Sequence, residues 1–283
     1  MISEEEVKSL MIAMKKRYGL DFTNYETKSL NRGITRLMSK HKMNGMIDLW
    51  GRILKDDDFF MSSIDDLLVN LTELFRNPDA WMMIRDEVLP TFKRANEINI
   101  WHAGCSTGEE IYTMAIVLEE SNMLFKSSMM ATDLSQTALR KAKSGIYSKA
   151  SLKNYLKPFM KFFPDRSMED YFDFGENGAC IKPRYTKKVT FDRHNLVELK
   201  MEKKFDIIFC RNVMIYFDSE LKSRILNFLN GCLNDGGYLI LGYYDTMPNE
   251  SIDLFDIHNN STRIYKKRLT PIKERYEQES VNS

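Results

Sequence analysis

The sequence has few cysteines and histidines, and none of them is spaced as a disulfide or metal motif. The four cysteines lie far apart, with no Cys-x-x-Cys pair: Cys105, Cys180, Cys210 and Cys232. The four histidines are scattered as well. We therefore expect neither a disulfide scaffold nor a bound metal, and a reducing, cytoplasmic location fits best.

Long apolar runs and an excess of one charge are also absent. No stretch has the roughly 20 apolar residues that cross a bilayer, and the opening residues MISEEEVKSL are acidic, unlike a signal peptide. The 283 residues include 41 basic and 40 acidic side chains, for a net charge of +1. A general nucleic-acid binder would be more basic. We expect neither nucleic-acid binding nor direct membrane insertion.

The patterns that are present divide the chain into two parts. Residues 1–66 lack strand alternation and predict a small all-α domain. Over 67–268, apolar runs rich in β-formers alternate with helical patterns, which predicts an α/β domain with a mostly parallel sheet. Residues 148–188 interrupt this alternation and predict an inserted small β subdomain. Residues 269–283 form a polar tail.

One predicted helix of the N-terminal domain, over 28–42, has a cationic face. Its basic residues recur at every fourth position: Lys28, Arg32, Arg36 and Lys40. No acidic residue lies between Glu26 and Asp48. This face is either a solvated surface or a docking surface for an acidic partner, such as a carboxylate-rich helix. The stretch KDDDFF, at 55–60, reads as an acidic loop between helices.

The stretch WHAGCSTGEEIYTMA, residues 101–115, predicts a ligand-binding turn between a strand and a helix. Gly104 and Gly108 leave the main chain open to a ligand, at the place where open α/β sheets bind theirs. The middle glycine of a dinucleotide fingerprint is missing, and Glu109 and Glu110 would repel phosphates. A cationic cofactor without phosphate, such as S-adenosylmethionine, fits better. The two acids could instead only compensate the helix dipole.

Polar residues follow two further predicted strands. Asp133 ends the next strand, where a carboxylate can accept hydrogen bonds from ribose hydroxyls. The stretch KFDIIFCRNVMIYFD, at 204–218, predicts a buried strand whose polar tip lies beside the glycine turn. Cys105 is interpreted as a small turn residue, because no histidine is placed to activate it.

These motifs resemble those of the CheR family, the methyltransferases of chemotaxis receptor glutamates. The shared stretches occur in order over residues 8–268: NLTELFR (70–76), AGCSTGEEIY (103–112), ATDLSQTALRKAKSGIY (131–147), NL (195–196) and FCRNVMIYFD (209–218). The resemblance implies a Rossmann-like S-adenosylmethionine methyltransferase fold and cytoplasmic action on the helical bundle of a chemoreceptor. The expected products are glutamate methyl esters and S-adenosylhomocysteine, and the expected state is a monomer.

The resemblance also implies which residues bind the cofactor. They are Asn70, Thr72, Arg76, Gly104, Glu110, Asp133, Asn195, Leu196, Arg211 and Asn212. In the family pattern, Glu110 reaches the amino acid part of the cofactor, Asp133 the ribose, and the pair 195–196 the adenine.

Arg76 and Tyr216 stand where the family positions the methyl group and the incoming carboxylate. A glutamate carboxylate is already ionised at pH 7, so its attack on the methyl group needs no general base. Arg76 could hold one carboxylate oxygen while the other faces the methyl group, with Tyr216 donating a hydrogen bond. The plainer alternatives are a packed aromatic for Tyr216 and, for Arg76, an ion pair with Asp79 or Glu73.

Two stretches depart from the family pattern, and other functions stay open. GYYDTMP, at 242–248, replaces a GHSE-like or GSSE-like stretch near the rim of the site. The loop FGENGACIK is short relative to that of members that bind a receptor's C-terminal pentapeptide, so we expect the cationic helix to carry the docking.

The alternative functions are methylation of another acidic protein or of a small carboxylic acid, and a non-catalytic signalling scaffold. A dehydrogenase is disfavoured by the missing glycine.

Overall fold

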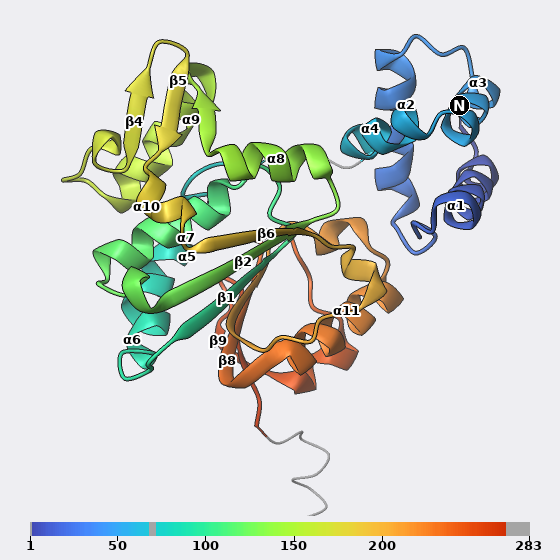
Figure 1. The fold of residues 1–283 in the computed structure, drawn as a ribbon. Helices are drawn as coiled ribbons and strands as arrows, with labels where there is room; N and C mark the ends of the chain where they lie inside the picture. The colour runs from blue at the N-terminus through green and yellow to red at the C-terminus, as the bar shows by residue number, and fades with distance from the viewer. Residues whose placement is uncertain (1, 68–71, 270–283) are drawn as a thin grey trace, which may run out of the picture. The chain divides into compact units, whose positions relative to one another are not determined.

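The computed structural model describes residues 2–67 and 72–269, and its contacts divide the chain into two units (Figure 1). Of the described residues, the helical unit comprises 2–67 and 215–222, and the sheet unit comprises 72–214 and 223–269. The short segment 215–222 thus packs with the N-terminal helices, although it follows a strand of the sheet unit in the chain.

The described part of the helical unit contains four helices at its N-terminal end, in agreement with the predicted all-α fold. They are α1 (Glu4–Tyr18), α2 (Thr27–Lys40), α3 (Met46–Lys55) and α4 (Asp57–Leu67). Ser3 and Glu6 form a capping box that starts α1, and Gly19 ends it in a left-handed conformation (φ 70°). The core of the unit contains Leu10, Ile34, Leu49 and Phe60, all fully buried.

The prediction of an acidic loop at 55–60 is wrong. Helix α3 ends at Lys55 and α4 begins at Asp57, so only Asp56 separates them. Asp56 Oδ1 accepts a hydrogen bond from the Phe59 N–H at 2.8 Å and satisfies a free donor of the new helix. Acidic residues are favourable in a first turn because the helix dipole is positive there.

Residues 215–222 are tied to the loop between α1 and α2. Tyr25 and Phe217 form an antiparallel bridge, and their rings meet edge to face with centroids 4.9 Å apart. The Glu26 N–H donates to the Tyr216 carbonyl at 2.7 Å. Tyr216 is therefore a residue of the helical unit.

The sheet unit contains a seven-stranded sheet in the order β6-β2-β1-β7-β8-β10-β9. The strands are β1 (Ile98–Ala103), β2 (Ser127–Asp133), β6 (Val189–Arg193), β7 (Phe205–Cys210), β8 (Leu233–Leu241), β9 (Phe255–Asn259) and β10 (Ile264–Lys267). The first five pair in parallel, and β10 runs antiparallel to both β8 and β9. This arrangement confirms the predicted α/β class. Strand β9 was not predicted.

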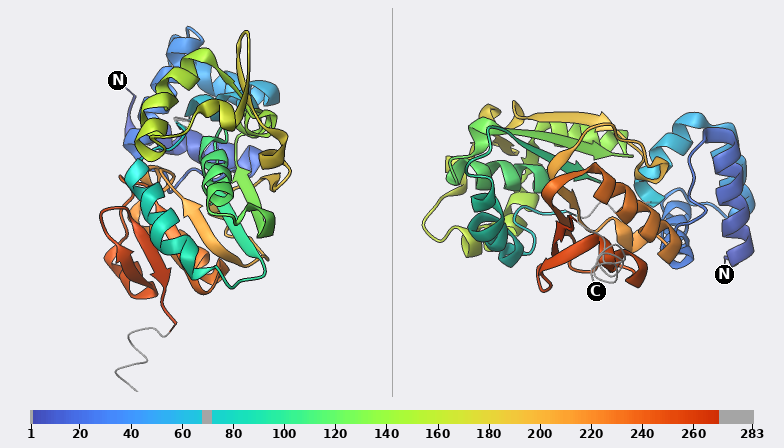
Figure 2. Two further views of the ribbon diagram at one scale, coloured as in Figure 1. Left: turned by 90° about the vertical axis from the view of Figure 1, so that its left-hand side faces the viewer. Right: turned by 90° about the horizontal axis from the view of Figure 1, so that it is seen from below.

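Helices cover both faces of this sheet, with α5 and α7 on one side and α11 on the other (Figures 1 and 2). Before β1, the chain forms α5 (Pro78–Met83), a π-helical turn (Ile84–Val88) and α6 (Leu89–Thr91). The connecting helices are α7 (Glu109–Glu120), α8 (Gln136–Ser144) and α11 (Ser219–Cys232). The carboxyl ends of β1, β2, β6, β7 and β8 consequently meet at one edge, where a ligand of such a sheet binds.

The predicted inserted β subdomain is present and begins slightly earlier than expected. Its three strands, β3 (Ile146–Ser148), β4 (Phe172–Gly175) and β5 (Gly178–Ile181), form an antiparallel sheet in the order β3-β5-β4. Two helices complete it, α9 (Lys149–Phe162) and α10 (Pro183–Thr186). Buried aromatic side chains, including Tyr147, Phe159 and Phe172, join it to the main core.

Candidate active site

The turn between β1 and α7 has the conformation that its glycines suggest. Gly104 and Gly108 both have positive φ angles, 80° and 94°. A Cβ on Gly104 would clash with Val213 Cγ2, so only glycine lets this turn approach the segment after β7. The N–H groups of Gly104 and Cys105 donate to the Thr132 carbonyl at 2.8 and 2.9 Å.

Asp133 lies directly against this turn, at the end of the neighbouring strand β2. Its Oδ2 accepts a hydrogen bond from the Ser106 N–H at 2.7 Å, and its Oδ1 accepts one from the Ser135 N–H at 2.9 Å. The Ser106 hydroxyl is buried and, among the described residues, has no hydrogen-bond partner. A buried, unpaired hydroxyl beside a carboxylate fits a polar ligand group such as a ribose.

Asn195 and Leu196 lie at the same edge of the sheet. They follow β6, the strand next to β2, and the His194 N–H donates to the Asp133 carbonyl at 3.1 Å. Both side chains are buried, and Asn195 Oδ1 accepts from the Val197 N–H at 3.4 Å. The structure therefore brings the predicted ribose and adenine contacts together.

Glu110 belongs to a buried charged group at the start of α7. Its Oε1 lies 2.9 Å from His102 Nδ1, and its Oε2 lies 3.2 Å from an Arg211 guanidinium nitrogen. Burial by itself raises the pKa of Glu110, but the hydrogen bond to His102 and the charge of Arg211 outweigh it and lower the pKa. Glu110 is therefore ionised at neutral pH. His102, which the sequence reasoning did not single out, helps to hold it.

Arg211 connects Glu110 to the segment that follows the NLTELFR motif. Its guanidinium donates to the Arg76 carbonyl and to Asn77 Oδ1, both at 3.0 Å. Its side chain is only 4% exposed and lies over the Trp81 ring, 5.4 Å from the centroid. Burial lowers the pKa of Arg211, and the charge of Glu110 opposes that effect. The guanidinium is thus bound by groups of the protein itself. A direct contact of Arg211 with the cofactor stays a prediction.

Arg76 and Thr72 are partly buried, and Asn70 lies outside the described residues. The Arg76 carbonyl also accepts a hydrogen bond from Trp81 Nε1 at 3.1 Å, so two side chains hold the main chain at this position. Asp79, one of the alternative partners of Arg76, pairs with Lys161 at 2.8 Å. Tyr216 belongs to the helical unit and Arg76 to the sheet unit, and their joint action stays a prediction.

Asn212 follows β7 with a left-handed backbone (φ 59°). Its N–H donates to Asp245 Oδ2 at 2.6 Å. The sequence reasoning missed Asp245, because it treated GYYDTMP only as a departure from the family pattern. The signal that could have found it is the acid in the fourth position, which GYYDTMP shares with the GHSE-like stretch that it replaces.

Glu109 does more than compensate the helix dipole. Its two carboxylate oxygens accept hydrogen bonds at 2.7 Å, one from the Tyr155 hydroxyl and one from the Thr107 hydroxyl. Burial raises the pKa of Glu109. Because Tyr155 lies on α9 and the Tyr147 hydroxyl donates to the Thr107 carbonyl at 3.1 Å, the inserted subdomain supports the glycine turn.

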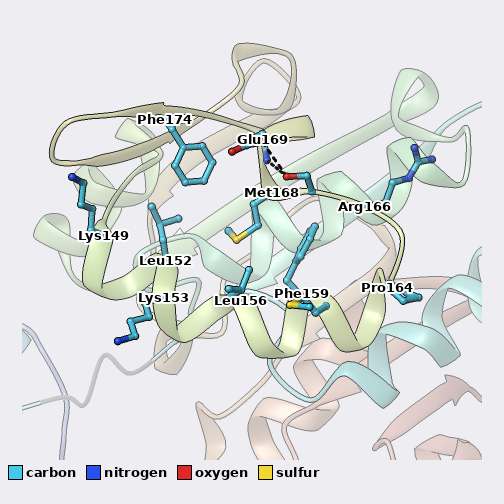
Figure 3. A pocket seen from close by; sticks show the side chains of 12 residues that line it. Lys149, Leu152, Lys153, Leu156, Phe159, Pro164, Arg166, Met168, Glu169 and Phe174 are labelled. Carbon is cyan, nitrogen blue, oxygen red and sulfur yellow. Dashed lines mark hydrogen bonds between the residues drawn. The ribbon is translucent and has the colours of Figure 1, made fainter.

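Helix α9 also lines an apolar groove of about 520 Å³ (Figure 3). Leu152, Leu156 and Phe174 form part of its lining, with Lys149 and Lys153 along the helix beside them.

Cys105 is buried in the glycine turn, and burial raises the pKa of its thiol. A protonated, inaccessible thiol matches its interpretation as a small turn residue.

The cationic face of α2 is exposed but not free of acidic neighbours. The Arg36 guanidinium donates to the Asp66 carbonyl, and Lys40 pairs with the Asp66 carboxylate at 2.8 Å. Arg32 donates to the Ser29 hydroxyl at 3.0 Å. Asp66 of α4, which lies far away in sequence, thus places a carboxylate beside Lys40 and a main-chain carbonyl beside Arg36, and the docking role of this face stays a prediction.

Residues 2–67 and 72–269 contain no group of three or more His, Cys, Asp or Glu side chains that could hold a metal ion. Within the same ranges, every helix is too short or too polar to cross a membrane.

Family models match both parts of the chain. The model described as CheR methyltransferase, all-alpha domain, matches residues 5–68. The model described as CheR methyltransferase, SAM binding domain, matches residues 70–264.

Individual relatives agree over most of their length. Cher3 of Pseudomonas putida, whose name gives a methyltransferase but no substrate, is 32% identical over 93% of this chain and 96% of its own. Chemotaxis protein methyltransferase 1 of Vibrio cholerae is 30% identical over 94% of this chain and 98% of its own. The chemotaxis protein methyltransferase of Borreliella burgdorferi is 36% identical over 65% and 67%.

The domain matches cover the helical N-terminal part and the sheet that carries the glycine turn, Asp133 and Glu110. The chain belongs to the CheR methyltransferase family and is an S-adenosylmethionine-dependent methyltransferase.

Proposed function

We propose that this protein methylates glutamate side chains of chemoreceptors and so forms glutamate methyl esters for chemotactic adaptation. The observation that carries this proposal is the ionised Glu110, 15% exposed, next to a glycine turn whose Ser106 N–H donates to the Asp133 carboxylate. This arrangement suits a cationic cofactor with a ribose and disfavours a pyrophosphate. The names of the Vibrio cholerae and Borreliella burgdorferi relatives support a chemotaxis substrate.

The proposed cofactor contacts follow from this arrangement. Asp133 would accept hydrogen bonds from the ribose, with Asn195 and Leu196 beside the adenine. Glu110 would place negative charge near the amino acid part, and Gly104 would let the cofactor approach the main chain. Thr72, Arg76, Arg211, Asn212 and Asn70 complete the proposed set. Bound S-adenosylmethionine supplies an electrophilic methyl group on a sulfonium.

In the proposed reaction, the protein's contribution is orientation and charge. Arg76 would hold one oxygen of the substrate carboxylate with its planar guanidinium, leaving the other oxygen to form the new bond to the methyl carbon. Tyr216 would donate a hydrogen bond to the same carboxylate. The carboxylate is ionised at neutral pH, so no residue needs to remove a proton.

The proposed roles of the domains also rest on charge. Residues 1–66 would dock the acidic helical bundle of a receptor, and residues 67–268 would carry the methyltransferase site. Of the cationic face, Lys28 and Arg32 would contribute most, because Asp66 already engages Arg36 and Lys40. We expect the enzyme to act in the cytoplasm as a monomer.

A comparison of methyl acceptors tests this proposal. The purified chain is incubated with labelled S-adenosylmethionine and either a chemoreceptor cytoplasmic fragment, an unrelated acidic protein or a small dicarboxylic acid. Label transferred only to the receptor fragment supports the proposal. Transfer to the other acceptors alone, or cofactor binding without transfer to any of them, contradicts it.

A further inference from the structure

Two loops that follow neighbouring strands of the sheet unit meet at one buried carboxylate. Strand β7 leads into residues 211–213, and strand β8 leads into residues 242–248. Asp245, in the second loop, is fully buried, whereas Tyr243 and Tyr244 are 58% and 70% exposed. The loop therefore turns its acid inward and its two aromatic side chains outward.

Asp245 binds the main chain of both loops. Its Oδ2 accepts a hydrogen bond from the Asn212 N–H at 2.6 Å and another from the Gly242 N–H at 2.7 Å. Hydrogen bonds to an ionised carboxylate are stronger than those between neutral groups. Asp245 thus determines where residue 212 lies relative to the end of β8.

Asn212 adopts a conformation that needs such support. Its φ of 59° is left-handed, a region that residues other than glycine rarely occupy and that asparagine tolerates better than most. Gly242 permits the close approach of the two loops, because a Cβ there would lie 2.5 Å from the Asn212 nitrogen. The next residue, Val213, packs against Gly104 of the glycine turn. The backbone at Asn212 therefore affects how this loop meets that turn.

The same carboxylate contributes to the charge balance around Arg211. Burial lowers the pKa of Arg211, while the negative charges of Glu110 and Asp245 act in the opposite direction. Glu110 reaches the guanidinium directly, at 3.2 Å. Asp245 acts on the adjacent main chain, so it contributes both to the position and to the electrostatic environment of the pair 211–212.

We propose that Asp245 is a positioning residue of the cofactor site, which holds Asn212 and Arg211 in place through the main chain. The inference rests on the proposed placement of the cofactor at these two residues. It accounts for the departure at GYYDTMP: this loop, like the GHSE-like stretch that it replaces, has an acid in its fourth position. Cofactor binding then depends on Asp245, whereas the exposed Tyr243 and Tyr244 affect only the surface of the loop.

Calorimetry with S-adenosylhomocysteine tests the inference on the full chain. Asp245→Ala should raise the Kd about tenfold or more, which corresponds to the loss of one strong hydrogen bond. Asp245→Asn keeps an acceptor oxygen without the charge and should restore part of the affinity. In turnover assays, the KM for S-adenosylmethionine should rise more than kcat falls.

Two control variants separate positioning from general destabilisation. Asp235→Asn changes an acid near the start of β8, the strand that leads into the loop of Asp245. Its side chain is 81% exposed, and the substitution should leave the Kd unchanged. Ile225→Val removes a buried methyl group from α11 and should lower the Tm without changing the Kd. If an Asp245 variant and Ile225→Val lower the Tm by the same amount, the Asp245 variant should still have a much higher Kd.

The outcomes distinguish this inference from the proposed function. Folded Asp245→Ala and Asp245→Asn variants with a Kd within about twofold of wild type would overturn the inference. The same holds if their Kd rises no more than that of the Ile225→Val control. A wild-type chain that binds S-adenosylhomocysteine but methylates no receptor contradicts the proposed substrate alone, since the binding data still decide the role of Asp245. A wild-type chain without binding overturns both.

Discussion

Asp133 and Arg76 are assigned different tasks in the proposed site, and each can be removed by a single substitution. Asp133 is the last residue of β2 and accepts hydrogen bonds from two loop N–H groups. Arg76 lies in the segment before α5, where its carbonyl is held by Arg211 and Trp81. Loss of the first should affect cofactor affinity, and loss of the second should affect turnover.

Asp133→Ala should weaken S-adenosylhomocysteine binding by about 1–3 kcal/mol, because the ribose loses hydrogen bonds to a charged group. Calorimetry gives the affinity, and a thermal melt checks that the variant is folded. Asp192→Ala, an exposed acid on the neighbouring strand β6, is the matched control and should bind normally. An unchanged affinity in folded Asp133→Ala would rule out the ribose assignment.

Arg76→Ala should reduce methyl transfer by about 100-fold or more, the usual loss when a group that orients the transition state is removed. Arg76→Lys should recover little of it, because a point charge does not reproduce the planar guanidinium. Tyr216→Phe should be impaired less severely. Methyl-transfer rates at saturating cofactor are compared between these variants and the wild type. Normal rates in both Arg76→Ala and Tyr216→Phe would place the active site elsewhere.

At the level of helices and strands, the first turn of α7 carries two adjacent acids with opposite environments. The pKa of Glu109 is raised, mainly by burial. For Glu110, burial also acts to raise the pKa, but the contacts with His102 and Arg211 prevail and lower it. Neighbouring residues on one helix therefore contribute to stability with opposite dependence on pH.

A pair of substitutions, Glu109→Gln and Glu110→Gln, makes this difference measurable. The raised pKa of Glu109 means that its contribution to stability is present below the unfolded pKa of about 4.3 and is lost as the pH rises through the folded pKa. Glu109→Gln should therefore gain stability relative to wild type as the pH rises. The lowered pKa of Glu110 means that its contribution is present above about pH 4.3 and is lost as the pH falls through the folded pKa.

Glu110→Gln should accordingly cost stability at pH 7, and this cost should shrink in acid. Denaturant unfolding of the three proteins between about pH 3.5 and 8 gives the differences in the free energy of unfolding. Parallel pH profiles for the two variants would contradict the opposite environments of the two acids.

Periodicity predicted most of these elements, and the misses have local causes. The parallel strands are continuous apolar runs, and the glycine turn is marked by its residues, so both could be found without a structure. Strand β9, with the sequence FDIHN, is short and mostly polar, and it lies at the edge of the sheet with β10 as its neighbour. The stretch at 55–60 has the composition of an acidic loop, but a capped first turn of a helix has the same composition, so composition alone does not distinguish the two.

Partners that are distant in sequence were not predictable from spacing. Asp245 and Asn212 are 33 residues apart, and Asp66 lies 30 residues from Arg36. Each pair depends on which loops and helices the fold places side by side. Gly104 and Asp133 were predictable in position because they lie at the ends of two neighbouring parallel strands, whereas Asn195 was predicted from the family resemblance alone.

The two units together raise the question of how an acidic substrate is recruited. Lys28→Glu combined with Arg32→Glu should raise the KM for a receptor fragment while leaving cofactor affinity unchanged. Surface charges act mainly on encounter, so the difference from wild type should diminish as salt screens them. Lys8→Glu combined with Lys16→Glu, on the exposed side of α1, makes the same charge change and is the matched control. Normal receptor kinetics at low salt for the α2 variant would show that this face is only solvated.

The most direct test of the account is to locate the transferred methyl group. A receptor cytoplasmic fragment is incubated with the enzyme and S-adenosylmethionine, and its peptides are sequenced by mass spectrometry before and after mild alkali. The account predicts methyl groups on glutamate side chains, removed by alkali as expected for esters, and far fewer of them when Arg76→Ala replaces the wild type in the same incubation time. Methyl groups that resist alkali, or that lie on residues other than glutamate, would contradict it.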